Sequence, residues 1–146
     1  MNSVSKDIAY KLLSVAPTVV SGTFGGTANW SIFVNTQPTS PKNVFSVWDS
    51  PGRNPQYSMD KSKNPLRYSG FQLRVRGTNY NTTWSKLQDA IKALVQLGRF
   101  VVTDGTTDVI YSTISETTEI IPLGVDEKES YMFSSNLIAI RREKDA

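Results

Sequence analysis

The sequence contains no cysteine and no histidine. The chain therefore forms no disulfide, has no thiolate or imidazole for nucleophilic catalysis, and lacks the residues that most often bind zinc. No apolar run approaches the roughly 20 residues that span a bilayer. The N-terminal segment carries Lys6 and Asp7 inside its apolar pattern, which is not typical of a signal peptide. Carboxylate chemistry, lysine chemistry and oxygen-ligated metals are what remain.

The acidic residues show no arrangement that favours catalysis or metal binding. They fall mostly in expected turns or near helix ends, as Asp7 does, and Asp is common in turns for conformational reasons. Those in turns are Asp104, Asp108, Asp126, Glu127 and Glu129. The glycines at positions 22, 25 and 26 are not followed by the lysine of a phosphate-binding loop, so they predict a flexible connection. The sequence predicts no catalytic residue, no metal site and no cofactor.

Positive charge is concentrated in one segment. The net charge is +3, and Ser50–Tyr68 holds four cations, Arg53, Lys61, Lys63 and Arg67, against the single anion Asp60. Five of the seven prolines lie between positions 38 and 65, which predicts a long irregular loop at about 50–68. Long loops in compact domains are commonly functional. A solvated or partner-facing loop is the favoured interpretation, and contact with nucleic-acid phosphate, helped by Tyr57 and Tyr68, is the alternative.

Two helices are expected. Apolar residues at helical spacing predict a helix over residues 4–15, which Pro17 ends. A second amphipathic helix is predicted over 80–97, capped by Thr78 or Asn79 and ended by Gly98 in a left-handed conformation. Trp84 falls on the apolar stripe of this helix and is expected in the core.

The remaining periodic segments predict strands. These are residues 30–35, 44–50, 69–77, a hairpin turning at Asp104-Gly105, a short strand within 117–124, and 131–143 with a bulge near Leu137. At 146 residues the chain fits one domain. The expected fold is therefore a single α+β domain over residues 1–146, with a mixed, mostly antiparallel sheet and two helices packed on it.

Three further side chains are candidates for an interface. Trp48 lies at the mouth of the long loop, where contact with a partner and burial in the core are equally favoured. In the strand 69–77, Arg74 and Arg76 share one face. That face either forms salt bridges to a neighbouring subunit or is an ordinary solvated surface.

The run VWDSPG at 47–52, followed by FQLRVRGTNY at 71–80 and an amphipathic helix, resembles the tail-terminator and minor-capsid family of long-tailed bacteriophages. The similarity covers roughly residues 44–98. The positions that match the family pattern are Asp49, Pro51, Gly52, Val75, Arg76, Gly77 and Tyr80.

The resemblance implies a structural virion protein and no enzyme. It implies a ring, a hexamer by analogy, that caps the tail tube, ends tail growth and joins the tail to the head connector. The implied partners are the chain itself, the major tail tube protein and the head-completion protein. Genomic DNA would pass through the ring without specific binding, no membrane would be involved, and assembly would occur in the host bacterial cytoplasm.

The interface residues expected from this combination of sequence and resemblance are Trp48, Asp49, Arg53, Tyr57, Lys61, Lys63, Arg67, Arg74 and Arg76. Another neck or tail-tube structural protein is the main alternative function. A nucleic-acid-binding module, supported by the basic aromatic loop, is the second alternative.

Overall fold

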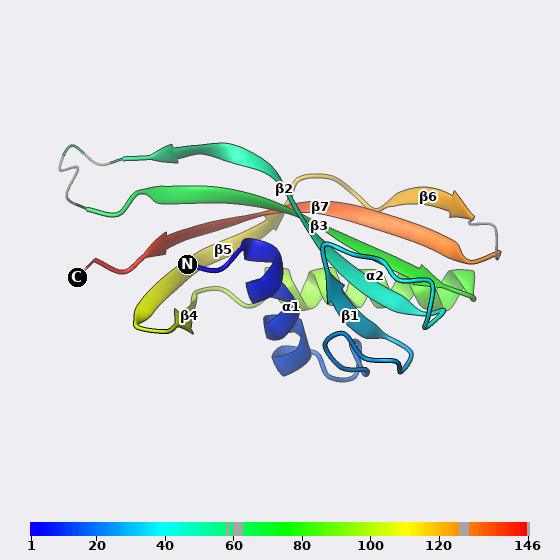
Figure 1. The fold of residues 1–146 in the computed structure, drawn as a ribbon. Coiled ribbons are helices and arrows are strands. Elements are labelled where there is room, and N and C mark those ends of the chain that lie inside the picture. Colours follow the sequence, from blue (N-terminus) through cyan, green and yellow to red (C-terminus); the bar gives the residue numbers. More distant parts are fainter. Residues whose placement is uncertain (58, 60–62, 126–128, 146) are drawn as a thin grey trace.

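The structure, a computed structural model, describes residues 1–57, 59, 63–125 and 129–145. Over these residues one sheet of seven strands is covered on one face by two helices (Figure 1). The elements are α1 (Val4–Val15), β1 (Ser31–Val34), β2 (Val44–Gln56), β3 (Leu66–Gly77), α2 (Tyr80–Val95), β4 (Phe100–Asp104), β5 (Thr107–Glu116), β6 (Ile121–Val125) and β7 (Tyr131–Glu143). The predicted α+β fold is confirmed.

The sheet is mixed and mostly antiparallel. Its strand order is β1-β2-β3-β7-β5-β4, and β6 pairs with β7 outside this path. Only the pairing of β1 with β2 is parallel among the described strands. Since β3 occupies one edge of β7, β5 and β6 share the other edge: β5 pairs near the C-terminal end of β7 and β6 near its N-terminal end. The connection from β5 to β6 therefore follows the middle of β7, beside α2.

The core lies between the helices and the inner face of the sheet. Phe45, Phe71 and Phe133 from the sheet and Leu12 and Leu87 from the helices are at most 1% exposed. Burying a side chain of this size stabilises the fold by about 1.5–3 kcal/mol. Both helices are thus held by long-range packing of the apolar stripes that their sequences predict.

The N-terminus of α2 is capped by a neighbouring residue in the sequence, whereas that of α1 is capped by a residue from a strand. The side chain of Asn79 accepts a hydrogen bond from the Thr82 amide at 3.0 Å, and Gly98 has a φ of +63°, so both predicted features of α2 are confirmed. Ser3 makes no side-chain cap at α1. The carboxylate of Asp49, on β2, accepts instead from the Ser5 amide at 3.0 Å and from the Ser5 hydroxyl at 2.9 Å. A strand residue therefore supplies the cap that the helix itself does not.

The long loop predicted at about 50–68 is largely a β-hairpin, so that prediction was wrong over most of its length. β2 continues through Pro51 and Pro55 to Gln56, and β3 begins at Leu66. Proline is tolerated because β1 covers β2 only up to Val47, which leaves this part of β2 at the edge of the sheet. The register shifts twice between Ser50 and Gln56, as expected for a strand that must accommodate irregular residues. Residues 50–68 are called the hairpin arm below.

The bulge expected near Leu137 lies elsewhere. The pairing of β7 with β3 is continuous from Arg141 to Tyr131. The shifts lie in the strands on the other edge of β7: Ser112 is an extra residue between Tyr111 and Thr113 of β5, and Leu123 is one between Pro122 and Gly124 of β6. The apparent slip in the β7 pattern arises because Ile138 is half-buried on the outer face of the sheet. Within the described ranges, neither helix is long and apolar enough to cross a membrane.

Candidate functional site

The hairpin arm presents most of the predicted cationic residues at the surface. Arg53 and Lys63 are exposed, and Arg67 is half-buried. The Arg53 guanidinium lies 5.6 Å from the centre of the Tyr68 ring, a cation–π contact that keeps the charge at the surface. Tyr57 is 61% exposed. These predicted interface residues therefore lie together on one projecting element, and Lys61 lies outside the described residues.

Trp48 and Arg74 lie together on the outer face of the sheet, the face opposite the helices. Trp48 is half-buried, and the Arg74 guanidinium is 4.9 Å from the centre of its ring. Arg74 also donates from Nε to Oε1 of Gln72 at 2.6 Å. The indole nitrogen of Trp48 is buried without a hydrogen-bond partner in the described structure. Trp48 is thus neither fully buried in the core nor fully exposed to a partner, the two roles that its sequence position favours equally.

Arg76 is buried inside the subunit, at 6% exposure. Its guanidinium donates to the carbonyl oxygens of Pro38, Pro41 and Lys42 at 2.5, 2.7 and 3.3 Å. These bonds fasten the β1–β2 connection across the outer face of the sheet. Sequence analysis expected Arg76 either to contact a neighbouring subunit or to be solvated, and its burial is a correction. Alternation places Arg76 on the outer face but does not show that another segment of the chain covers it.

Asp49 also acts within the subunit. Besides capping α1, its carboxylate accepts from Nδ2 of Asn35 at 2.9 Å. Partial burial opposes ionisation, but the hydrogen bonds from Asn35 and Ser5 and the charge of Arg141 outweigh it, so the pKa of Asp49 is lowered. Asp49 thus has a structural role within the subunit, and its expected interface role stays a prediction.

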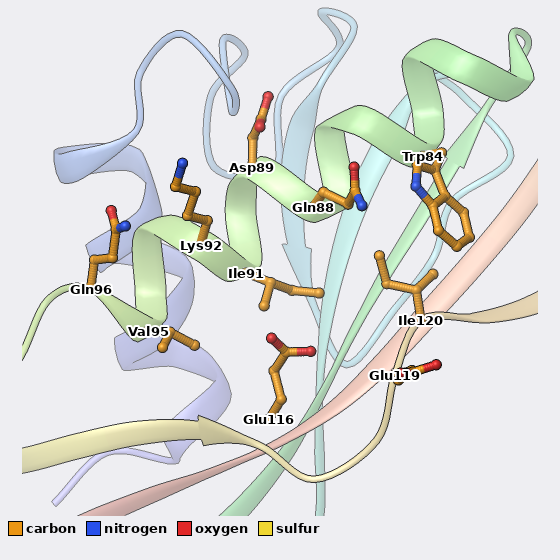
Figure 2. Close-up of a pocket in the computed structure, with 10 residues that line it drawn as sticks. All are labelled: Trp84, Gln88, Asp89, Ile91, Lys92, Val95, Gln96, Glu116, Glu119 and Ile120. Carbon is orange, nitrogen blue, oxygen red and sulfur yellow. The ribbon is translucent and has the colours of Figure 1, made fainter.

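A groove that sequence analysis missed runs between α2 and the β5–β6 connection (Figure 2). Its volume is about 650 Å³, within the range of pockets that hold ligands or partner side chains. Its lining residues are Trp84, Gln88, Asp89, Ile91, Lys92, Val95, Gln96, Glu116, Glu119 and Ile120. Apolar side chains of α2 and Ile120 face one another across it, whereas Glu116 and Glu119 carry carboxylates on the side of the connection (Figure 2).

Trp84 belongs to the wall of this groove more than to the core. It is half-buried, and its ring packs edge-on against Phe133 at a centroid distance of 5.3 Å. The Tyr80 ring stacks beside it and is 48% exposed. The prediction that Trp84 is a core residue was therefore only partly correct. The signal that could have revealed the groove is the apolar run from Ile120 to Val125, since a strand with apolar residues at successive positions requires cover on both faces.

β6 extends the same exposed surface. All five of its residues are exposed, and Ile121, Leu123 and Val125 are 42%, 43% and 55% exposed. Its outer edge pairs with no other described strand. Isolated edge strands of this kind are common sites for contact with another chain.

The buried ionisable groups form a closed structural cluster. The Tyr111 hydroxyl donates to Oδ2 of Asp7 at 2.5 Å, and Arg141 donates to the Tyr111 oxygen at 3.2 Å. The side chains of Asp7 and Arg141 are only 2% and 8% exposed. Burial, with the contact to Asp7, raises the pKa of Tyr111 despite the opposing charge of Arg141. Because these groups satisfy one another away from solvent, they tie α1 to the sheet and offer no site to a substrate.

Within the described ranges, no three carboxylates gather closely enough to hold a metal ion. The candidate functional surfaces are therefore the cationic hairpin arm, the Trp48–Arg74 pair, and the groove with the neighbouring β6. Each of them is suited to contact with a macromolecule.

Comparison with known proteins agrees with a structural role. No curated protein sequence matches the chain. A chain in the solved structure titled "Virion of native gene transfer agent (GTA) particle" is similar to it, with a TM-score of 0.61 and 14% identity over 93% of this chain and 92% of that chain. At this identity the likeness shows the fold alone. A family model described as bacteriophage tail terminator protein matches residues 12–142. The chain thus belongs to the bacteriophage tail terminator family and is a structural protein of the phage tail.

Proposed function

We propose that this protein forms a ring on the last ring of the tail tube, ends tube growth, and provides the surface that joins the tail to the head connector. The family match over residues 12–142 is the observation that carries this proposal. The protein acts by binding and has no catalytic role. Its partners are further copies of itself, in a hexamer, together with the major tail tube protein and the head-completion protein, and genomic DNA passes through the ring.

The surfaces of the subunit suit such a ring. A closed ring of identical subunits requires two different, complementary surfaces on each subunit. The hairpin arm and the groove beside α2 are two such surfaces. Polar and charged groups on the sheet, among them Arg74 beside Trp48, are available for contact with the components above and below. Assembly takes place in the bacterial cytoplasm, where the tail is built.

The test is to remove the gene from its phage and examine the particles by electron microscopy. We expect tails of uncontrolled length that remain separate from filled heads, and restoration of normal particles when the intact gene is supplied from a plasmid. Tails of normal length joined to heads in the absence of the protein would overturn the proposal. Complete absence of tail tubes would also overturn it, because that result indicates a tube component.

A further inference from the structure

We propose that the groove between α2 and the β5–β6 connection receives the hairpin arm of a second copy of this chain. The inference rests on the proposed ring and specifies which two surfaces meet within it. The groove and the arm are two features whose composition the fold of a single subunit does not require.

The groove combines an apolar floor with acidic sides. Trp84, Ile91 and Ile120 supply the apolar surface. Glu116 and Glu119 are exposed on the β5–β6 side. Asp89 adds a third carboxylate from α2, and Lys92 is the only cation in the lining. The lining therefore carries a net charge of −3 + 1 = −2. Its occupant should present apolar side chains together with positive charge.

The hairpin arm has the matching composition. Its described residues include the cations Arg53, Lys63 and Arg67. Near its turn, Tyr57 is 61% exposed and Met59 is fully exposed. Aromatic residues, methionine and arginine are the side chains enriched in protein interfaces. The arm thus supplies an apolar tip flanked by cations, which complements an apolar floor flanked by carboxylates.

Electrostatic complementarity selects the arm as the occupant. Opposite charges on two surfaces steer their encounter and fix their register, whereas like charges disfavour wrong pairings. The exposed β6, by contrast, adds apolar surface without positive charge, since Ile121–Val125 holds no lysine or arginine. Of these two exposed apolar segments, the arm and β6, the arm carries the required sign.

The arm cannot fill the groove of its own subunit. The arm's strands β2 and β3 project from the body at one end of the sheet, whereas α2 lies beneath the sheet between its middle and the opposite end (Figure 1). The pairing of β3 with both β2 and β7 fixes the direction of the arm. Contact must therefore form between different copies. Because the arm and the groove are different surfaces, this contact is heterologous, and it generates a ring when the rotation between subunits closes.

The absence of cysteine allows a direct test by site-specific disulfide formation. Tyr57→Cys places one thiol on the arm, and Gln88→Cys places one in the groove. We expect the two purified variants, when mixed and mildly oxidised, to give a covalent dimer that a reductant reverses. Thr27→Cys, an exposed position in the α1–β1 connection, replaces Gln88→Cys in the control mixture and should give at least about tenfold less dimer. Equal cross-linking to positions 27 and 88 would overturn the proposal.

Charge reversal supplies an independent test. The arm variant Arg53→Glu/Lys63→Glu and the groove variant Glu116→Lys/Glu119→Lys should each raise the concentration needed for assembly at least about tenfold. A mixture of the two variants restores complementary charge at every contact when they alternate, and combining all four changes in one chain does the same. Reversal of Lys6 and Lys42, which are exposed elsewhere, is the matched control and should leave assembly unchanged.

The outcomes separate this inference from the proposed function. Rings seen by native mass spectrometry or on isolated tail tubes, without the cross-link and without any effect of arm or groove reversal, would overturn the arm-in-groove contact and leave the ring function standing. Failure of the wild-type chain to assemble either alone or on tail tubes would overturn both. Circular dichroism of each variant establishes that a loss of assembly is not a loss of fold.

Discussion

At the scale of single residues, two aspartate side chains, Asp49 and Asp7, hold the N-terminal helix in place. Asp49 caps α1 from a neighbouring strand, and Asp7 is buried against Tyr111 and Arg141. Both act through hydrogen bonds between segments distant in sequence. Their contributions to stability can be measured separately because the two clusters respond to opposite ends of the pH scale.

Replacing Asp49 with Asn should lower the free energy of unfolding by about 1 kcal/mol at neutral pH, since it weakens the cap of α1. The folded-state pKa of Asp49 lies below the value of 3.8 for an unperturbed aspartate. Its stabilisation is therefore complete above that value and is lost as the pH falls through the folded pKa. Urea unfolding at pH 7 and pH 3 should show the difference between wild type and variant shrinking in acid. The exposed Glu119→Gln is the control, and a difference that does not depend on pH would contradict the assignment.

Tyr111→Phe keeps the ring, which stacks on Phe100, and removes only the hydroxyl. We expect a loss of about 1–3 kcal/mol, because the buried Asp7 carboxylate loses its closest donor. The raised pKa of Tyr111 also means that the wild type loses stability as the pH rises above the unperturbed value of 10.0. The Phe variant lacks this ionisation, so its stability should fall less between pH 9 and 11. Parallel alkaline unfolding curves for the two proteins would rule this explanation out.

At the scale of secondary-structure elements, the hairpin arm shows what a sequence pattern predicts correctly and what it misses. Sequence analysis found the cationic, proline-rich segment but interpreted it as a loop, because Pro51 and Pro55 argue against a strand. The structure accommodates them at the edge of the sheet. Here two glycines let the backbones of β2 and β3 approach closely: a Cβ at Gly52 would lie 1.8 Å from the Tyr68 carbonyl oxygen, and one at Gly70 would lie 2.5 Å from that of Pro51. This close approach sets the path of the arm.

Gly70→Ala should therefore lower the free energy of unfolding by about 1–3 kcal/mol, as expected when a side chain is forced into a filled space. We also expect weaker assembly, because the arm is displaced from its native direction. Arg53→Ala, which removes an exposed side chain from the same arm, is the control for stability and should change it by less than about 0.5 kcal/mol. Unfolding in urea gives the first quantity, and sedimentation at several concentrations gives the second. A fully stable Gly70→Ala protein would show that β2 and β3 can separate here without cost.

At the scale of the whole molecule, the subunit has a cationic projection at one end of the sheet and an acidic, partly apolar groove beside α2 (Figure 1, Figure 2). This separation suits head-to-tail association. It also predicts how the assembly should respond to solution conditions, since exposed charges are screened by salt whereas apolar contacts are not.

Raising the ionic strength from about 0.1 M to about 1 M shortens the Debye length from about 10 Å to about 3 Å. Assembly measured by light scattering should weaken over this range, while the unfolding midpoint of the subunit changes little. The charge-reversed arm variant, Arg53→Glu/Lys63→Glu, should show the opposite trend, because salt relieves its repulsion from the groove. If salt affected the wild type and this variant equally, charge on the arm would not contribute to association.

The sequence by itself determined the class of function and most of the elements. The lack of histidine and cysteine excludes the common catalytic groups, the helical and alternating patterns locate both helices and most strands, and the Asp49–Gly52 and Val75–Tyr80 motifs identify the family. These properties depend on residue chemistry and short-range spacing, which sequence displays directly.

Only the tertiary structure decided which of the candidate residues are available to a partner. It buries Arg76 under the β1–β2 connection, engages Asp49 at the end of α1, and creates a groove from α2 and residues 116–120, which are remote in sequence. The physical reason is that exposure depends on what packs over a side chain. That cover comes from segments whose proximity is set by the pairing of strands and the packing of the core.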